Sequence, residues 1–431
     1  MQSTKAILPR TQKILAVLLL LAVYIPFLDL HGQSLIDKLA WDFPSFYYAG
    51  QLTFDLGISP YVPENWIEAE RLHDGTVYAF LYPPPSLPFF RPLNFLSYEN
   101  AKVLMLFINH LLILVFGYLF FFKLFEGELT DLFFLFGAVY TLSFYPLQDT
   151  LHSGQVNLLL LVLLTLVWLA VKQNRHPGLI ALPLAFAILL KLYPAIFLFY
   201  LLLRRNYKAI AWTVGILLLL AVATLPFLPA SAWPDWMAEV AGAGYGNVVR
   251  GQLPTAVRNQ SLNGLTARLF LGHADKFGPL IPSPLAARVL PLVLSGLVGL
   301  ATLALVFRAE QRQLPDRLDD SFALFLLTIF LVAPISWDYH LTFALPAILL
   351  AVRRVAFENS HKLILLITAG SALVLAYNFP FAADFLRRGP LSLLISIKLY
   401  AAGVLWLFFA WRLNRPVTAA RQAAVPQAEQ V

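Results

Sequence analysis

The chain has 431 residues, of which 59% are hydrophobic and only 13% are charged, and its mean hydropathy is +0.71. This composition excludes an ordinary water-soluble domain, and the absence of cysteine excludes disulfides and thiolate metal sites. The net charge of +7 resembles that of a nucleic-acid-binding protein. Because Lys and Arg cluster at the ends of apolar stretches instead, we expect no nucleic-acid partner.

Apolar stretches near the roughly 20 residues needed to cross a bilayer recur along the chain and predict an all-α integral membrane protein. The fifth, sixth and tenth are shorter and are interpreted as short or re-entrant helices. The first follows Lys5, Arg10 and Lys13 and resembles a signal peptide, but no small-x-small cleavage site follows it, so we expect an uncleaved anchor. The twelve predicted helices cover residues 14–30, 102–122, 132–148, 155–171, 178–190, 194–203, 209–228, 287–307, 321–335, 341–352, 362–378 and 392–411.

The distribution of basic residues predicts the orientation of these helices. Short connections on one side contain most of the Lys and Arg, whereas those on the other side contain only Lys191, Arg387 and Arg388. Positive charge marks the cytoplasmic side. We therefore expect a multi-pass protein of the inner (plasma) membrane with both termini in the cytoplasm and two long outward loops, of about residues 31–101 and 229–286.

The predicted domain organisation is simple. Residues 1–412 are expected to form a single polytopic transmembrane domain. Residues 413–431 are rich in Ala, Gln and Pro, a composition typical of a disordered segment, and are expected to form a cytoplasmic tail.

The first outward loop contains a carboxylate, Asp42, among many aromatic residues. Asp42 directly precedes Phe43 and Pro44, a pattern in which an Asp is an ordinary helix N-cap. A carboxylate at the outer membrane interface is also suited to act as a general base. The residues alone leave both roles open. A short helix is predicted further along the same loop, at Glu64–His73.

Other polar residues lie at predicted outward helix ends. Lys191 stands in a short outward turn, where it either pairs with a phosphate or extends its amine to the interface. Arg258 is followed by amide side chains, a combination suited to a phosphate or sugar site. The amides at these outward ends serve equally well as hydrogen bonds between helices; they are Gln155, Asn157, Asn259, Gln260 and Asn263.

Several of these residues fall within motifs that resemble those of glycosyltransferase family 87 over roughly residues 35–350. The motifs, in order, are Asp42–Gly50 with Ser59-Pro60-Tyr61, Tyr82-Pro83-Pro84, Gly154-Gln155-Val156-Asn157-Leu158, Lys191-Leu192-Tyr193-Pro194, Asn259-Gln260-Ser261-Leu262-Asn263-Gly264 and Pro334-Ile335-Ser336-Trp337-Asp338-Tyr339-His340. Members of that family are similar to polyprenyl-phosphate-mannose-dependent α-mannosyltransferases. The resemblance implies the glycosyltransferase-C membrane fold, a bundle of about twelve transmembrane or re-entrant helices.

The resemblance also implies an activity and its residues. It implies inverting transfer of a hexose, most simply mannose, from a polyprenyl-phosphate donor to a glycolipid or glycan hydroxyl on the extracytoplasmic face. The family's first-loop Asp, acting as base, maps onto Asp42, and its later His maps onto His340. The chain departs from many relatives at Tyr339, where they carry a second His, so the resemblance does not extend to a His pair.

The remaining site residues are assigned with this chemistry in mind. Lys191 and Arg258 are predicted to bind the donor phosphate, and membrane lipids surround the protein. No metal or cofactor is expected, because no His-x-x-x-His spacing and no nucleotide-type Gly-rich loop occur. The candidate substrate-binding residues are Tyr48, Tyr82, Gln155, Asn157, Asn259, Gln260, Asn263 and Trp337.

A transporter or flippase of a lipid-linked saccharide is the main alternative from another class. Twelve helices with polar residues at membrane depth would suit such a protein. Transporters, however, are commonly built from two related halves with broken helices in equivalent positions. The segments after the first and seventh predicted helices share no detectable sequence similarity, which favours the enzyme.

Overall fold

The computed structural model describes residues 25, 41–73, 76–125, 131–241, 245, 254–273, 277–314, 316–358 and 361–415. Within these ranges the secondary structure is helical, apart from one isolated bridge between His273 and Phe277. Five of the described helices are long and apolar enough to cross a membrane: Tyr98–Leu124, Tyr207–Phe227, Pro284–Gln311, Asp338–Phe357 and Gly389–Asn414. The predicted all-α membrane class is therefore confirmed. The count of twelve stays a prediction, and its first helix lies outside the described residues except for Ile25.

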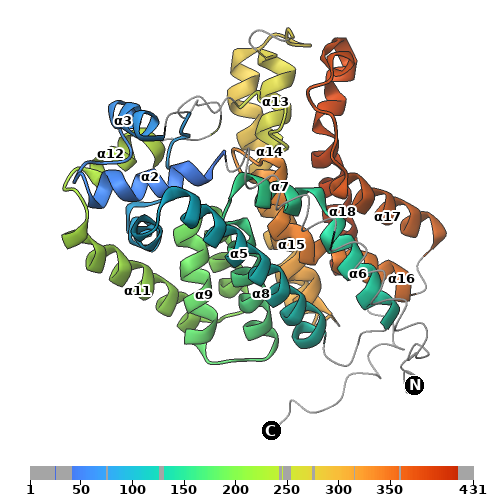
Figure 1. Cartoon of the computed structure of the whole chain (residues 1–431). Helices are drawn as coiled ribbons and strands as arrows, with labels where there is room; N and C mark the ends of the chain where they lie inside the picture. The colour runs from blue at the N-terminus through green and yellow to red at the C-terminus, as the bar shows by residue number, and fades with distance from the viewer. Residues whose placement is uncertain are drawn as a thin grey trace.

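The helices of the bundle follow the apolar segments of the sequence closely (Figure 1). In the first half they are α5 (Tyr98–Gly117) continued by the π-helical η3 (Tyr118–Leu124), α6 (Asp131–Ser143), α7 (Tyr145–Ser153), α8 (Asn157–Lys172), α9 (Pro177–Leu190), η4 (Tyr193–Ile196) and α10 (Phe197–Leu203). In the second half they are α11 (Tyr207–Thr224), η5 (Leu225–Phe227), α12 (Ala232–Trp236), η6 (Met237–Ala241), α13 (Leu262–Leu271), α14 (Pro284–Gln311), α15 (Arg317–Val332), η7 (Asp338–Ala344), α16 (Leu345–Phe357), α17 (Lys362–Ala376), η8 (Asp384–Arg387), η9 (Gly389–Ser396) and α18 (Ile397–Asn414).

Burial separates the central helices of the bundle from the peripheral ones. In the span Asp338–Phe357, 78% of the most apolar 18-residue stretch is buried inside the protein. In the span Tyr207–Phe227, only 11% of the corresponding stretch is buried. Figure 1 shows α11 and α17 on opposite sides of the bundle, with α8, α9 and α15 between them. Helices that are apolar on every side but exposed at the periphery, such as α11, are those expected to face lipid.

The described residues of the segment predicted to be the first outward loop fold into short helices over one end of the bundle. These are α2 (Phe43–Phe54), α3 (Pro63–His73), η1 (Pro84–Ser86), α4 (Leu87–Phe90) and η2 (Arg91–Phe95). Aromatic side chains form the core of this layer; Phe46, for example, stacks on Phe90 with ring centroids 4.8 Å apart. The helix predicted at Glu64–His73 is confirmed as α3, which begins one residue earlier, at Pro63.

The predicted helix over residues 132–148 is broken into α6 and α7. The break falls at Phe144, whose backbone is extended, and Pro146 follows within the first turn of α7. Proline lacks the N–H that would continue the hydrogen-bond ladder of α6, so the chain turns and starts a new helix. As a result α7 lies at an angle to α6 (Figure 1) and ends next to the first outward loop.

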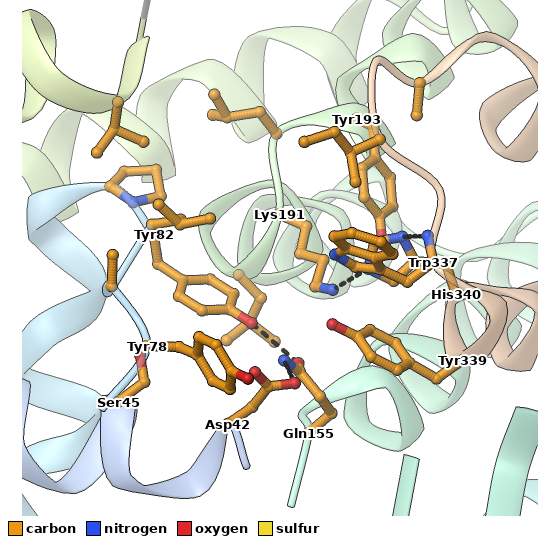
Figure 2. Close-up of a pocket in the computed structure, with 18 of the residues that line it drawn as sticks. Asp42, Ser45, Tyr78, Tyr82, Gln155, Lys191, Tyr193, Trp337, Tyr339 and His340 are labelled. Carbon is orange, nitrogen blue, oxygen red and sulfur yellow. Dashed lines mark hydrogen bonds between the residues drawn. The ribbon is translucent and has the colours of Figure 1, made fainter. Parts of the chain in front are cut away.

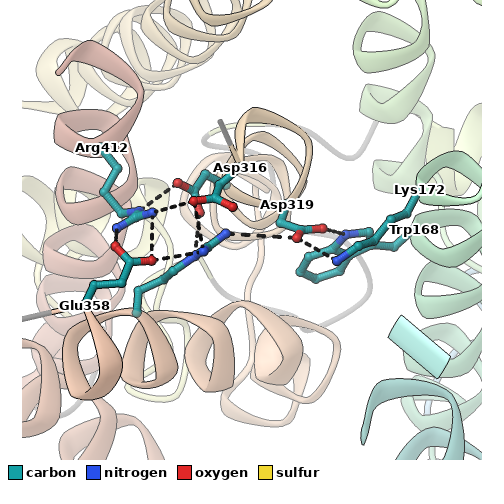
Figure 3. Close-up of polar contacts among 8 residues, drawn as sticks. Trp168, Lys172, Asp316, Asp319, Glu358 and Arg412 are labelled. Carbon is teal, nitrogen blue, oxygen red and sulfur yellow. Dashed lines mark hydrogen bonds and ion pairs between the residues drawn. The ribbon is translucent and has the colours of Figure 1, made fainter. Parts of the chain in front are cut away.

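An ion-pair network joins the far end of α8 to the start of α15 and the ends of α16 and α18 (Figure 3). Lys172 lies 2.8 Å from Asp319, and Arg412 lies 2.7 Å from Asp320. The α8 helix has 16 residues, so the network stands about 24 Å along the helix from Asn157. It fixes the relative positions of these helices at the end opposite the first outward loop.

Candidate active site

A cavity of about 430 Å³ opens between the first outward loop and the bundle. Its polar lining comes from five separate parts of the chain: the start of α2, the segment before η1, the α7–α8 junction, the α9–η4 junction, and η7 with its N-cap residue Trp337 (Figure 2). The predicted site residues found in its wall are Asp42, Tyr82, Gln155, Lys191, Trp337 and His340. Tertiary structure thus brings residues nearly three hundred positions apart to one small volume.

Asp42 occupies the N-cap position of α2, but its side chain makes no capping hydrogen bond. Its backbone N–H donates to the Ser153 carbonyl at 3.1 Å, and its Oδ2 accepts a hydrogen bond from Gln155 Nε2 at 2.8 Å. The interpretation of Asp42 as a side-chain cap is therefore not supported. The carboxylate faces the cavity together with Gln155 (Figure 2).

Gln155 is placed by the way α7 ends. Gly154 adopts a left-handed conformation, with φ of 64°, which a residue with a Cβ adopts only at a cost. Gln155 therefore lies in the short junction between α7 and α8, which begins at Asn157. The Tyr82 hydroxyl donates to Gln155 Oε1 at 3.1 Å, so Tyr82, Gln155 and Asp42 form one continuous hydrogen-bonded chain.

The electrostatic surroundings of Asp42 favour a strong base. Burial raises the pKa of Asp42 above its usual 3.8. The Gln155 hydrogen bond, the Lys191 charge and the nearby Tyr339 hydroxyl each lower this pKa in part, without cancelling the effect of burial. A carboxylate with a raised proton affinity is better suited to accept a proton than one in water.

Lys191 provides the positive charge of the cavity. Its Nζ lies 2.9 Å from His340 Nε2 and within 6 Å of the ring centroids of Tyr193 and Tyr339, at 5.9 and 5.8 Å. It forms no ion pair with a carboxylate in the described part of the chain. Burial lowers the pKa of Lys191 to about 7, and the negative charge of Asp42 opposes that decrease. A buried cation without a carboxylate partner is suited to bind an anion.

Arg258, the other predicted phosphate-binding residue, is placed differently. It is not part of the cavity wall and forms an ion pair with Asp149 of α7. Burial by itself would lower the pKa of Arg258, but the Asp149 carboxylate outweighs this effect and raises it. In the structure, the positive charge of Arg258 neutralises the Asp149 carboxylate. A contact between Arg258 and a donor phosphate therefore stays a prediction.

The Asn259–Gly264 motif lies behind the cavity wall. Asn259 Oδ1 accepts the Ser336 N–H at 3.0 Å, Gln260 N–H donates to the Ser336 carbonyl at 2.7 Å, and Asn263 Nδ2 donates to the Pro334 carbonyl at 2.9 Å. All three amide residues are fully buried. They hold the backbone that leads into η7, which carries Trp337, Tyr339 and His340. Their predicted contact with substrate is not seen in the cavity lining and stays a prediction.

Two further predicted substrate-binding residues also lie outside the cavity wall. Asn157 is fully buried, and its Nδ2 donates to the Tyr339 carbonyl at 3.4 Å. Tyr48 packs within the aromatic layer, and its hydroxyl donates to the Leu72 carbonyl at 3.4 Å. Conversely, Tyr78 and Tyr339 line the cavity but were not among the predicted site residues. Neither has a local sequence signal, since tyrosines are frequent throughout the first loop and Tyr339 departs from the family pattern.

Comparison with known proteins identifies the family. A model of glycosyltransferase family 87 matches residues 80–334, which is more than half of the chain. The chain belongs to glycosyltransferase family 87. The matched region includes Tyr82, Gln155 and Lys191, whereas Asp42 precedes it and His340 follows it.

Three similar proteins come from Mycolicibacterium smegmatis and Mycobacterium tuberculosis. The chain is 30% identical over 240 residues to the polyprenol-phosphate-mannose-dependent alpha-(1-2)-phosphatidylinositol mannoside mannosyltransferase of Mycolicibacterium smegmatis, covering 53% of this chain and 48% of that protein. It is 32% identical over 209 residues to the protein with the same name in Mycobacterium tuberculosis, covering 47% and 43%. A third relative, from another strain of that species, is a polyprenol-phosphate-mannose-dependent alpha-(1-2)-phosphatidylinositol pentamannoside mannosyltransferase, 32% identical over 224 residues, with 51% and 46% covered. The chain spans about half the length of these relatives.

Proposed function

We propose that this family 87 member transfers a hexose, mannose by analogy with its relatives, from a polyprenyl-phosphate donor to a hydroxyl of a glycolipid or glycan. The reaction takes place at the extracytoplasmic side of the membrane, the side to which charge distribution assigns the Asp42 loop. The observation that carries the proposal is the pairing, in one cavity, of a carboxylate and a cation that serve opposite ends of such a reaction. The polyprenol-phosphate-mannose dependence of the mycobacterial relatives supplies the donor class.

Asp42 acts as the general base in a single displacement. The acceptor oxygen attacks the anomeric carbon, and its proton passes to the Asp42 carboxylate as the new carbon–oxygen bond forms. The bond between the anomeric carbon and the phosphate oxygen breaks at the same time, so the sugar configuration inverts and polyprenyl phosphate leaves. The raised pKa of Asp42 supports this role, because proton transfer is most effective when the base has a proton affinity near the working pH.

Lys191 and His340 stabilise the phosphate that leaves. At 2.9 Å, two positive charges would repel strongly, so the pair carries at most one positive charge. Stabilising charge that develops in the transition state is usually the largest single contribution to catalysis. A cation held in place by its neighbours performs this task without needing to be reoriented during the reaction.

The aromatic side chains of the cavity are suited to hold the sugar. Trp337 and Tyr339 each present a ring with a polar tip to the cavity (Figure 2). Such residues combine an apolar face, on which the C–H side of a sugar ring can pack, with a hydrogen-bonding group for its hydroxyls. Binding the sugar on these rings would place its anomeric carbon between Asp42 and Lys191.

The experiment that tests the function measures release of free polyprenyl phosphate. Purified protein is incubated with polyprenyl-phosphate mannose and a glycolipid acceptor extract, and the lipid products are separated. The expected result is acceptor-dependent release of polyprenyl phosphate by the wild type, loss of release in Asp42→Asn, and retention in Asp55→Asn. Asp55 is the matched control because it lies at the end of the same helix, where it pairs with Arg91 outside the cavity. A transporter or flippase would leave the donor intact in every case, which would overturn the proposal.

A further inference from the structure

Gln155 differs from the other polar residues of the cavity in that both ends of its amide are bonded to protein. Its Oε1 accepts from the Tyr82 hydroxyl at 3.1 Å, and its Nε2 donates to Asp42 Oδ2 at 2.8 Å. The side chain is 6% exposed. The sequence offered Gln155 and Tyr82 as substrate-binding residues, but these bonds already occupy the groups with which they would bind a sugar.

We infer that Gln155, held in place by Tyr82, is a positioning residue that orients the Asp42 carboxylate toward the acceptor and stabilises its ionised form. The inference rests on the proposed function, in which Asp42 is the base. Gln155 and Tyr82 then keep Asp42 oriented and ionised, and their loss should shift the acid limb of the pH profile of turnover.

The direction of the amide is fixed by its two partners. An ionised carboxylate only accepts hydrogen bonds, so it requires the N–H side of the amide. The oxygen side must then face Tyr82, whose hydroxyl can donate to it. Removing the Tyr82 hydroxyl would leave the amide free to turn its oxygen toward Asp42, where it would repel the carboxylate.

The backbone fixes the distance between the two residues. Asp42 N–H donates to the Ser153 carbonyl at 3.1 Å, and Gln155 N–H donates to the Thr150 carbonyl at 3.0 Å. Both residues are therefore attached to the last turn of α7. Because the start of α2 and the start of α8 share this anchor, the amide and the carboxylate keep their register when substrate enters or product leaves.

Gln155 is needed because of what else surrounds Asp42. The charged and titratable groups that face Asp42 are Lys191 at the end of α9, Tyr339 of η7, Tyr82 and, from α7, Asp149. Burial favours the neutral acid, and the negative charge of Asp149 acts in the same direction. The Gln155 hydrogen bond is the largest opposing effect, ahead of the Lys191 charge. Without it, a larger fraction of Asp42 would be protonated and unable to act as a base.

The test is the pH profile of turnover for Gln155→Leu, measured with saturating polyprenyl-phosphate mannose. We expect the acid limb to move by about one pH unit to higher pH. At a pH on the acid limb, turnover should therefore be lower than that of the wild type, and it should approach the wild-type value as the pH rises toward the plateau. The KM for the donor should stay close to that of the wild type. Gln155→Glu, which places a second carboxylate beside Asp42, should move the limb further in the same direction. Tyr82→Phe should give a smaller shift of the same sign.

Gln148→Leu is the matched control, because Gln148 lies nearby, on α7, but donates to the Leu142 carbonyl outside the cavity. Its pH profile should coincide with that of the wild type. An unchanged acid limb in both Gln155→Leu and Tyr82→Phe would overturn the inference. A rise in the KM for the donor or acceptor without a shift of the acid limb would also overturn it, because that result would show direct substrate contact. If Gln155→Leu does not fold, Tyr82→Phe provides the decisive profile. Failure of the proposed function itself is distinguishable, since the wild type would then release no polyprenyl phosphate.

Discussion

Gln155 donates a 2.8 Å hydrogen bond to the carboxylate of Asp42, although the two residues are 113 positions apart in the sequence. The bond replaces the capping interaction that the position of Asp42 at the start of α2 would otherwise favour. It connects the first outward loop to the α7–α8 junction and points a carboxylate into a cavity that also contains Lys191. The predictions below concern the roles that this arrangement gives to individual residues.

Replacing Asp42 by Asn should abolish most of the activity and leave the protein folded. Turnover should fall by roughly 10² or more, the range for loss of a general base. The thermal unfolding temperature should stay near that of the wild type, because the Asp42 side chain makes no capping bond that the substitution could remove. Turnover is measured as release of polyprenyl phosphate, and unfolding is followed in the same detergent. Wild-type turnover by Asp42→Asn would exclude Asp42 as the base.

The pH dependence of kcat/KM should be bell-shaped. Asp42 is active only when deprotonated, so activity should rise with pH through a pKa above the usual 3.8. Lys191 is charged only below its own pKa, so activity should fall again as pH rises through about 7 in the free enzyme. Bound phosphate stabilises the ammonium, and the alkaline limb of kcat should therefore lie at higher pH than that of kcat/KM. In Lys191→Arg the alkaline limb should disappear, because a guanidinium stays charged. An alkaline limb that is the same in both proteins would show that Lys191 is not the group responsible.

Lys191 and Arg258 should respond differently to the same substitution. Lys191→Met should raise the apparent KM for the donor far more than that for the acceptor, since its ammonium faces the cavity. Arg258→Met removes the ion-pair partner of the buried Asp149 and should mainly lower the unfolding temperature. Donor and acceptor KM values and thermal unfolding of both variants check this. If Arg258→Met instead raises the donor KM as strongly as Lys191→Met does, Arg258 binds the donor as its flanking amides predicted.

His340 should act together with Lys191, which it contacts, and with Asp42, which lines the same cavity. Turnover by His340→Ala should be severely impaired, because the Lys191 amine would lose the neighbour that holds it in place. Residues that act as one unit lose little more when both are removed than when one is. The double variants of His340→Ala with Lys191→Met and with Asp42→Asn should therefore be only slightly worse than the worse single variant. Fully multiplicative losses in turnover would show that His340 acts independently and is only an interfacial histidine.

Gly264→Ala should destabilise the segment that supports η7. A Cβ at this position would stand 2.3 Å from the Asn259 backbone oxygen, a distance that requires the backbone to move. Overpacking of this kind costs about 1–3 kcal/mol, and the unfolding temperature should fall by several degrees. Gly215→Ala is the control, since nothing lies within 4 Å of its added Cβ. Equal unfolding temperatures for the two variants would show that the Asn259–Gly264 segment is not tightly packed against its neighbours.

Features that depend on neighbours in the sequence were predictable from the sequence alone. Several apolar segments reappear as helices with nearly the same bounds; residues 155–171, for example, correspond to α8 at Asn157–Lys172. The short helix after Pro63 was predicted from its own residues. Asp42, Lys191 and His340, which the sequence singled out one by one, line a single cavity in the structure. Hydrophobic patterning and proline geometry are local properties, so they predict helices without any knowledge of tertiary contacts.

Only the tertiary structure decided which polar partner each side chain has. Asp42 bonds to Gln155 in preference to its own helix, Arg258 pairs with Asp149, and the Asn259 and Asn263 amides bond to the backbone around Pro334. In each case several residues of the chain could form an equivalent hydrogen bond or ion pair. A buried polar group forms it with a partner that lies within bonding distance. Reach is set by how α7, α8 and η7 pack against one another, and no local pattern in the sequence encodes that packing.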